Sequence, residues 1–107
     1  PSDFASLVRE TVALSLQDGD SSIDTVASRL GLSERTLQRR LHATSLNYKD
    51  ILADDRRSVA QQYLRDTGIP LTRIAAILGY SDLAAFSRSF HRAFGVSPRQ
   101  WRQVRLA

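Results

Sequence analysis

The sequence predicts an all-α protein of seven helices, arranged as two helix-turn-helix subdomains that a long linker helix joins. Three observations lead to this fold class. Apolar residues recur at spacings of three and four along most of the chain, which is typical of amphipathic helices. No stretch of useful length alternates apolar and polar residues as a half-buried strand does. Glycines and capping residues divide the chain into short helical segments.

The first subdomain is expected in residues 1–47 and begins with a helix that carries one apolar stripe. The residues of this stripe are Phe4, Leu7, Val8, Val12 and Leu16. After a turn rich in Asp and Gly, Ser22 can cap a short helix over residues 23–30. Gly31 then suits the left-handed position that follows a helix. This pair of helices should therefore pack through its apolar residues.

The third helix, over about residues 34–43, has the pattern of a recognition helix. Ser33 is a suitable N-cap, and Leu37 and Leu41 lie one turn apart where they can anchor the helix. The opposite side of this helix is polar and basic, so we expect it to face solvent.

A linker helix is predicted over residues 48–67, where Gly68 and Pro70 stop it. Its inward positions are Ile51, Leu52, Val59, Ala60, Tyr63 and Leu64. The second subdomain, residues 68–107, opens with a short helix over 71–78 that Gly79 closes.

The second recognition helix is expected over about residues 82–94, with Ser81 as its cap and Gly95 as its end. Its inward residues are Phe86, Phe90 and Phe94. The last helix starts at Ser97-Pro98-Arg99-Gln100, which has the spacing of a capping box with Pro at the first helical position.

The chain repeats itself, and the repeat defines the motif. Residues 22–33 align with residues 70–81 at an offset of 48, and the anchors of the two recognition helices follow in the same order. Ala27 and Ala75 are small enough to let two helices cross closely, and Gly31 and Gly79 permit the turn. A short helix, a tight turn and a capped second helix form a helix-turn-helix unit.

Two such units in one chain suggest that two DNA segments are read together. A linker helix of about twenty residues spans ~30 Å, close to the ~34 Å turn of B-DNA. We therefore expect one chain to insert both recognition helices into successive major grooves of double-stranded DNA, without the dimer that most such proteins need.

The composition supports an anionic partner and excludes several classes of function. Of 15 Lys and Arg residues, 14 are Arg, and the formal net charge is +4. Residues 29–42 carry a net charge of +3 and residues 81–107 carry +4, so the remainder is acidic. There is no Cys and there are only two His, so we expect neither a metal site nor a cofactor. No nucleophile–base pair, phosphate loop or membrane-spanning run is present in the sequence, and we expect no enzymatic activity and no membrane partner.

Arginine and polar side chains on the outer faces of the two recognition helices are the candidates for DNA contact. Arg can pair with guanine through two hydrogen bonds, Gln can read adenine, and small apolar groups can contact the thymine methyl. We predict base contacts from Arg35, Gln38, Arg39, Leu83, Ala84, Ser87 and Arg88. We predict phosphate contacts from Ser22, Arg40, His42, Thr72, His91, Arg92, Arg99 and Arg102. For Ser22 and Thr72 a role in helix capping alone stays open, and Arg102 could instead form an internal ion pair.

The chain resembles the AraC/XylS family of bacterial transcription regulators. The resemblance rests on Gly79-Tyr80-Ser81, Phe86-Ser87-Arg88-Ser89-Phe90, Gly95-Val96-Ser97-Pro98 and Trp101-Arg102, and on Arg56, Ala60, Leu64 and Thr67 in the linker helix. It covers the chain from about Ile23 to Arg102. Ser45 and Asn47 stand where this family usually has Gly and Ser, and we interpret both departures as structural.

The resemblance implies a DNA-binding domain that belongs to a longer regulator. An effector ligand would be bound by a separate domain absent from this chain, and the lack of any Met fits such a truncation. The family resemblance also implies a transcription activator that contacts RNA polymerase and acts in the cytoplasm, on the bacterial nucleoid.

One alternative comes from a different class: an all-α protein-interaction module that kept the fold and lost useful DNA binding. Such a module would have few cations on its outer faces. The first outer face, with Arg35, Gln38, Arg39 and His42, is fully polar, whereas the second is partly apolar.

Overall fold

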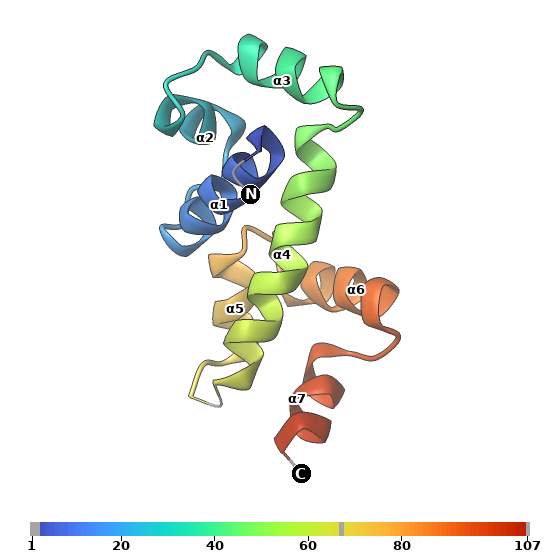
Figure 1. Cartoon of the computed structure of the whole chain (residues 1–107). Helices are drawn as coiled ribbons and strands as arrows, with labels where there is room; N and C mark the ends of the chain where they lie inside the picture. The colour runs from blue at the N-terminus through green and yellow to red at the C-terminus, as the bar shows by residue number, and fades with distance from the viewer. Residues whose placement is uncertain (1–2, 67, 107) are drawn as a thin grey trace. The chain divides into compact units, whose positions relative to one another are not determined.

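The computed structural model describes residues 3–66 and 68–106, which contain seven helices and no strand (Figure 1). The predicted fold class is therefore confirmed. The chain divides into two compact units, Pro1–Arg56 and Arg57–Ala107, and this boundary falls within helix α4, Tyr48–Arg65. The linker helix thus ends at Arg65, and its predicted last residue, Thr67, lies outside the described residues. None of the helices in the described residues is long and apolar enough to cross a membrane.

The first unit consists of three helices and the first part of α4. These helices are α1 (Phe4–Gln17), α2 (Ile23–Arg29) and α3 (Glu34–Ala43). Their core is aliphatic, and its most deeply buried side chains are Val8, Val12, Leu16, Val26, Leu37, Leu41 and Ile51. The core holds α3 by its two anchor leucines, as the spacing predicted.

The buried face of α1 differs from the predicted stripe. Leu7 was expected to face inward, but 48% of it is exposed. The side chain of Leu7 projects about 100° around the helix axis from that of Val8. Thr11 and Ser15 complete the buried face instead. Both hydroxyls donate to backbone carbonyls one turn earlier in the same helix, at 2.8 Å. Because these polar groups are satisfied inside the helix, their burial needs no partner from elsewhere.

The second unit consists of the rest of α4 and three further helices. These are α5 (Leu71–Ile77), α6 (Leu83–Phe94) and α7 (Pro98–Leu106). Aromatic rings fill much of its core. The ring centres of Phe86 and Phe90 are 5.9 Å apart and those of Phe90 and Trp101 are 6.1 Å apart, and both pairs meet edge to face. Phe94, which was predicted to face inward, is half-buried and stacks 4.5 Å from Phe90. The last helix is therefore held to the unit through Trp101.

The sequence repeat has a counterpart in the hydrogen bonds of the two turns. Leu32 donates its backbone N–H to the carbonyl of Ala27 at 2.9 Å, and Tyr80 donates to Ala75 at 3.0 Å, at the same offset of 48 residues. Gly31 has a φ of 71° and Gly79 a φ of 87°, as the motif requires. The two predicted helix-turn-helix turns are therefore present and equivalent, with Ala27 and Ala75 both buried beneath them.

Capping residues fix where each recognition helix begins. Ser33 caps α3 by accepting the N–H of Thr36 at 3.1 Å, as predicted. For α6 the prediction of Ser81 was wrong, because Asp82 is the N-cap and accepts the N–H of Ala85 at 2.8 Å. Both residues are good N-caps, so the sequence alone could not choose between neighbours.

The segments that follow the two recognition helices are also equivalent. Ser45 occupies the left-handed region with a φ of 60°, where the second unit has Gly95 with a φ of 78°. Asn47 then caps α4 by accepting the N–H of Asp50 at 2.8 Å. In the second unit, Ser97 and Gln100 form the predicted reciprocal capping box, at 3.0 and 3.1 Å. Ser45 and Asn47 thus perform the structural roles of the family's usual Gly and Ser.

Candidate nucleic-acid interface

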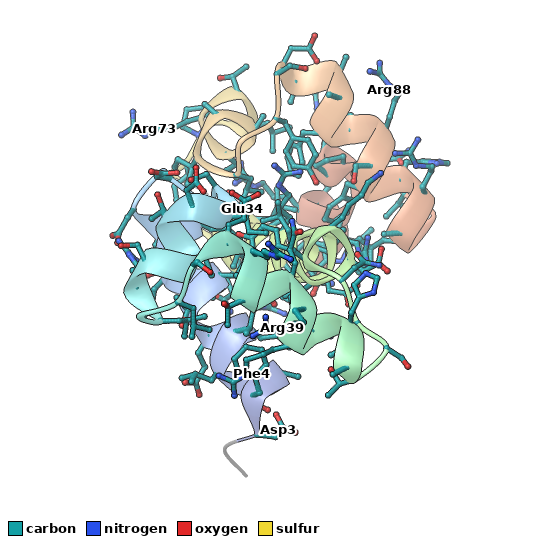
Figure 2. All side chains as sticks on the ribbon, turned by 90° about the horizontal axis from the view of Figure 1, so that it is seen from above. Asp3, Phe4, Glu34, Arg39, Arg73 and Arg88 are labelled. Atoms are coloured by element: carbon teal, nitrogen blue, oxygen red, sulfur yellow. The ribbon has the colours of Figure 1, made fainter. Side chains whose placement is uncertain are left out.

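Helix α3 presents a polar face to solvent because its opposite face is anchored. Leu37 and Leu41 are fully buried. The base-contact candidates Arg35, Gln38 and Arg39 are all exposed, and Figure 2 labels Arg39 on this helix. Their orientation agrees with the prediction, and their contact with DNA stays a prediction.

The N-terminus of α3 carries a pair of carboxyl groups. A hydrogen bond to Asp24 of α2, together with the negative charge of Asp24, raises the pKa of Glu34. Glu34 is exposed in the first turn of α3, where a negative charge suits the helix dipole. This acidic pair marks one end of the face that carries Arg35 and Arg39.

Helix α6 has the same arrangement with a less polar outer face. Phe86 and Phe90 are buried, while Ala84 and Arg88 are exposed and Figure 2 shows Arg88 projecting outward from α6. The remaining base-contact candidates on this helix, Leu83 and Ser87, are half-buried. Arg88 is therefore the only base-contact candidate on α6 that combines full exposure with hydrogen-bond donors.

Most of the predicted phosphate contacts are exposed side chains, on α3 and α6 and on the helices next to α6 in sequence. The exposed candidates are Arg40, His42, Thr72, His91, Arg92 and Arg99. Ser22 is exposed as well, but its hydroxyl caps α2 by accepting the N–H of Thr25 at 3.3 Å and donating to the Thr25 hydroxyl at 3.1 Å. The capping role that we left open for Ser22 is therefore present.

Arg102 has internal partners, in agreement with the internal alternative rather than with a free phosphate donor. Its Nε donates to the carbonyl of Leu64 at 3.0 Å, and its Nη2 donates to the carbonyls of Tyr63 at 3.4 Å and Asp66 at 3.0 Å. These carbonyls lie at the C-terminal end of α4, where backbone acceptors lack helical partners. The internal contact is a cap on backbone carbonyls and not the ion pair that we considered.

A hollow of about 630 Å³ lies beside α3 in the first unit. Its wall combines polar residues of α3 with the starts of α2 and α4, namely Ser21, Ser22, Ile23, Gln38, His42, Asn47, Tyr48, Lys49, Asp50 and Leu52. The Tyr48 hydroxyl donates to the carbonyl of Ser21 at 2.6 Å and closes one part of this wall. Lys49, the only lysine of the sequence, thus shares this wall with three candidate contacts, Ser22, Gln38 and His42.

The sequence analysis missed the contribution of α4 to this surface. A signal was available, because α4 begins five residues after α3 ends, so its first turn must return to the neighbourhood of α3.

The described residues contain no group of His, Asp and Glu side chains that could hold a metal ion.

Comparison with known proteins identifies the family. A family model described as a helix-turn-helix domain matches residues 26–104. The chain belongs to the AraC-type helix-turn-helix family. It is accordingly a DNA-binding domain of the kind found in transcription regulators, and the resemblance that the sequence motifs indicated is confirmed.

Relatives and solved structures agree with this membership. The HTH-type transcriptional regulator VirS of Mycobacterium tuberculosis is 43% identical over 105 residues, which cover 95% of this chain and 31% of that protein. The structure of the transcriptional regulator CdpR from Pseudomonas aeruginosa is 36% identical with a TM-score of 0.72, and the match covers 90% of this chain and 31% of CdpR. The DNA-binding domain of AdpA, solved in complex with a target DNA, is 27% identical with a TM-score of 0.68 and coverages of 91% and 90%. The chain spans about a third of the length of the curated relatives that it matches.

Proposed function

We propose that this chain reads double-stranded DNA by placing α3 and α6 in major grooves. The observation that carries the proposal is the equivalence of the two units: each holds its second helix by buried anchors and turns exposed arginine outward. A helix of this kind fits the major groove, where base edges offer a distinct pattern of donors and acceptors. The DNA-binding domain of AdpA was solved in complex with a target DNA, and this similarity supports DNA as the partner of the present chain.

The proposed base contacts are those of the two outer faces, Arg35, Gln38 and Arg39 on α3 and Leu83, Ala84, Ser87 and Arg88 on α6. The proposed phosphate contacts are Ser22, Arg40, His42, Thr72, His91, Arg92 and Arg99. Arg102 is left out of this set because its guanidinium already serves the end of α4.

The length of the helix that joins the two units supports binding to two segments of DNA. Helix α4 belongs in part to each unit and has 18 residues, which corresponds to a length of about 27 Å. One turn of B-DNA is ~34 Å, so a monomer could reach successive major grooves. We therefore propose that one chain protects ~15–20 base pairs.

The properties of the whole regulator are also proposals. Since the chain spans about a third of its curated relatives, effector binding would belong to another part of such a protein. The family resemblance supports an activator that contacts RNA polymerase and works on the bacterial nucleoid, in the cytoplasm. The alternative of an interaction module without DNA binding loses its main argument, because exposed arginines remain on α3 and α6.

Selection of bound duplexes from a random pool would test the reading of DNA. We expect an enriched site with two conserved segments about one helical turn apart, and a footprint of one chain that covers both. Enrichment of a single segment, or binding that requires a dimer, would contradict the two-groove proposal.

Substitution of the two central arginines would test the assignment of base contacts. Arg39→Ala and Arg88→Ala are each expected to cost about 1–3 kcal/mol of binding free energy and to relax specificity in one half-site. Arg29→Ala is a matched control, because Arg29 forms an exposed ion pair with Asp18 at the end of α2. That control should remove the same charge without changing base preference.

A further inference from the structure

The first residue of α1 lies against the recognition helix of the same unit. Phe4 is half-buried, and the guanidinium carbon of Arg40 lies 4.0 Å from the centre of its ring. This distance is well within the ~6 Å at which a cation and an aromatic face attract each other. Asp3 caps this end of α1 by accepting the N–H of Ser6 at 2.7 Å, and Figure 2 labels Asp3 and Phe4 side by side at the start of the helix. Phe4 is therefore held where it can fix the position of Arg40.

Arg40 occupies a flank of α3 rather than the centre of its outer face. Neighbouring residues of a helix point about 100° apart, so Arg40 lies to one side of Arg39. A reading helix in the major groove has the sugar-phosphate strands on its flanks. This side of α3 is the one next to α1, and Gln38, on the opposite side of Arg39, borders the hollow beside α4.

The stacking leaves the hydrogen-bond donors of Arg40 available. A guanidinium is planar, and its five N–H groups point outward in that plane, whereas a ring beneath it covers only one face. Among the described residues Arg40 has this ring contact and neither an ion pair nor a hydrogen bond, and its side chain is exposed. Arg29, by contrast, has its guanidinium paired with Asp18. Arg40 is thus oriented by an apolar partner that does not compete with an anion.

We propose that Phe4 is a positioning residue for DNA binding, and that its ring holds the Arg40 guanidinium ready for a backbone phosphate beside the groove that α3 enters. The proposal rests on the function proposed above and adds a residue of α1 to it. The family match begins at residue 26, so the ring that Phe4 supplies lies outside the part of the chain that the family model describes.

A double-mutant cycle would test this role. Phe4→Leu keeps an apolar side chain but removes the aromatic ring. Phe4→Trp keeps an aromatic ring for the guanidinium to lie against, and Arg40→Ala removes the cation. Affinity for the selected duplex would be measured by fluorescence anisotropy at several salt concentrations, with thermal unfolding of each variant alongside. Leu14→Ala is a control for the loss of an exposed apolar group from α1, since 58% of Leu14 is exposed.

We expect Phe4→Leu to weaken binding by about two- to fivefold when Arg40 is present and to have no effect in the Arg40→Ala background. Arg40→Ala should weaken binding evenly across sequences and flatten the salt dependence by about one unit of slope. Phe4→Trp and Leu14→Ala should bind as the unsubstituted chain does.

Two outcomes would overturn the positioning role. One is an equal loss from Phe4→Leu in both backgrounds, which would mean that Phe4 acts only through the stability of the unit. The other is an Arg40→Ala variant with unchanged affinity and salt dependence. Either result would leave sequence-specific DNA binding intact as long as the chain still selects a duplex and Arg39→Ala still relaxes its specificity, although the second would remove Arg40 from the proposed phosphate contacts. Failure of the duplex selection would instead count against the function itself.

Discussion

The arginines of this chain differ in what their guanidinium groups touch. Arg9 pairs with Asp54 at 3.4 Å, Arg65 lies 5.6 Å over the ring of Trp101, and Arg102 caps the end of α4. Those of the two reading helices, Arg35, Arg39, Arg40, Arg88 and Arg92, are exposed. Their exposure leaves the guanidinium donors accessible to a partner outside the chain, such as the DNA proposed above.

Asp55, on α4 in the first unit, is expected to make stability depend on pH. Burial raises the pKa of this half-buried carboxyl to about 6, although the charge of Arg9 opposes the shift, and an unperturbed Asp titrates at ~3.9. The folded chain therefore binds this proton more tightly than the unfolded chain does, so the contribution of Asp55 to the free energy of unfolding falls as pH rises from about 4 to about 6. We predict that Asp55→Asn is more stable than the unsubstituted chain at pH 7.5 and that this advantage shrinks towards pH 4.

Urea unfolding across this pH range would measure the difference between the two chains. Asp3→Ala is a control of opposite sign, because the hydrogen bond from the Ser6 backbone lowers the pKa of Asp3. The stability that Asp3 contributes is present above its unfolded pKa and is lost as pH falls, so the Asp3→Ala deficit should be larger at pH 7 than at pH 3. A pH-independent gain from Asp55→Asn would show that burial of its charge is not the cause.

Among the helical elements, the two equivalent ends of the recognition helices allow a matched prediction. Ser45 holds a left-handed conformation that favours glycine, with a φ of 60°. Ser45→Gly should therefore raise the free energy of unfolding by about 0.5–1 kcal/mol, and Gly95→Ser should lower it by about 1 kcal/mol. A Cβ at Gly95 would meet no atom within 4 Å, so the loss there comes from the backbone alone. Denaturant melts of both variants measure the effects, and equal signs for the two changes would contradict this account.

The two reading helices should differ in how sharply they discriminate bases. Helix α3 exposes Arg35, Gln38 and Arg39, whereas α6 exposes Ala84 and Arg88. Alanine can contact a thymine methyl but cannot form the paired hydrogen bonds that distinguish bases well. We predict larger penalties for base changes in the half-site of α3 than in that of α6, where DNA shape contributes more. A scan of all single-base changes in the selected site measures this, and equal or reversed penalties would refute it.

Most helix boundaries were predictable because their signals are local, although for α6 two adjacent residues were both suitable caps and the wrong one was chosen. The capping box at Ser97 and the glycine turn at Gly31 depend on residues that are close in sequence, and the structure has both. The buried anchors Leu37 and Phe86 followed from helical periodicity for the same reason. The repeat supported these predictions, because the same pattern of turn glycine, cap and anchors had to fit both units.

Features that depend on distant contacts were not predictable. Periodicity counted Leu7 as inward because it could not show which side of α1 the rest of the unit covers. The contact between Phe4 and Arg40 joins residues 36 positions apart, and no spacing rule connects them. For Arg102 the sequence left an internal role open, but only the fold brings it to the carbonyls of Leu64 and Asp66.

For the whole molecule, charge determines how affinity responds to salt. Among the residues whose exposure the structure describes, six exposed arginines lie on α3, α6 and α7, namely Arg35, Arg39, Arg40, Arg88, Arg92 and Arg99. If each displaces about one counterion, the slope of log affinity against log salt should be roughly −5. Arg92→Ala or Arg99→Ala should flatten it by about one and weaken binding evenly across sequences. Anisotropy titrations at four salt concentrations measure the slope; a change of base preference without a change of slope would mean that these residues read bases instead.

The contact of Arg102 with the end of α4 has a genetic consequence. The carbonyls of Tyr63 and Leu64 at the end of α4, and of Asp66 just after it, accept hydrogen bonds from this residue of α7. A stop codon at position 101 would remove both this cap and the buried Trp101 ring from the second unit, while α3 and α6 would keep all their residues. A missense codon for lysine preserves the charge but offers one nitrogen in place of a planar fork. The codons for Trp101 and Arg102 are therefore expected to tolerate few substitutions, for a reason that concerns folding rather than DNA.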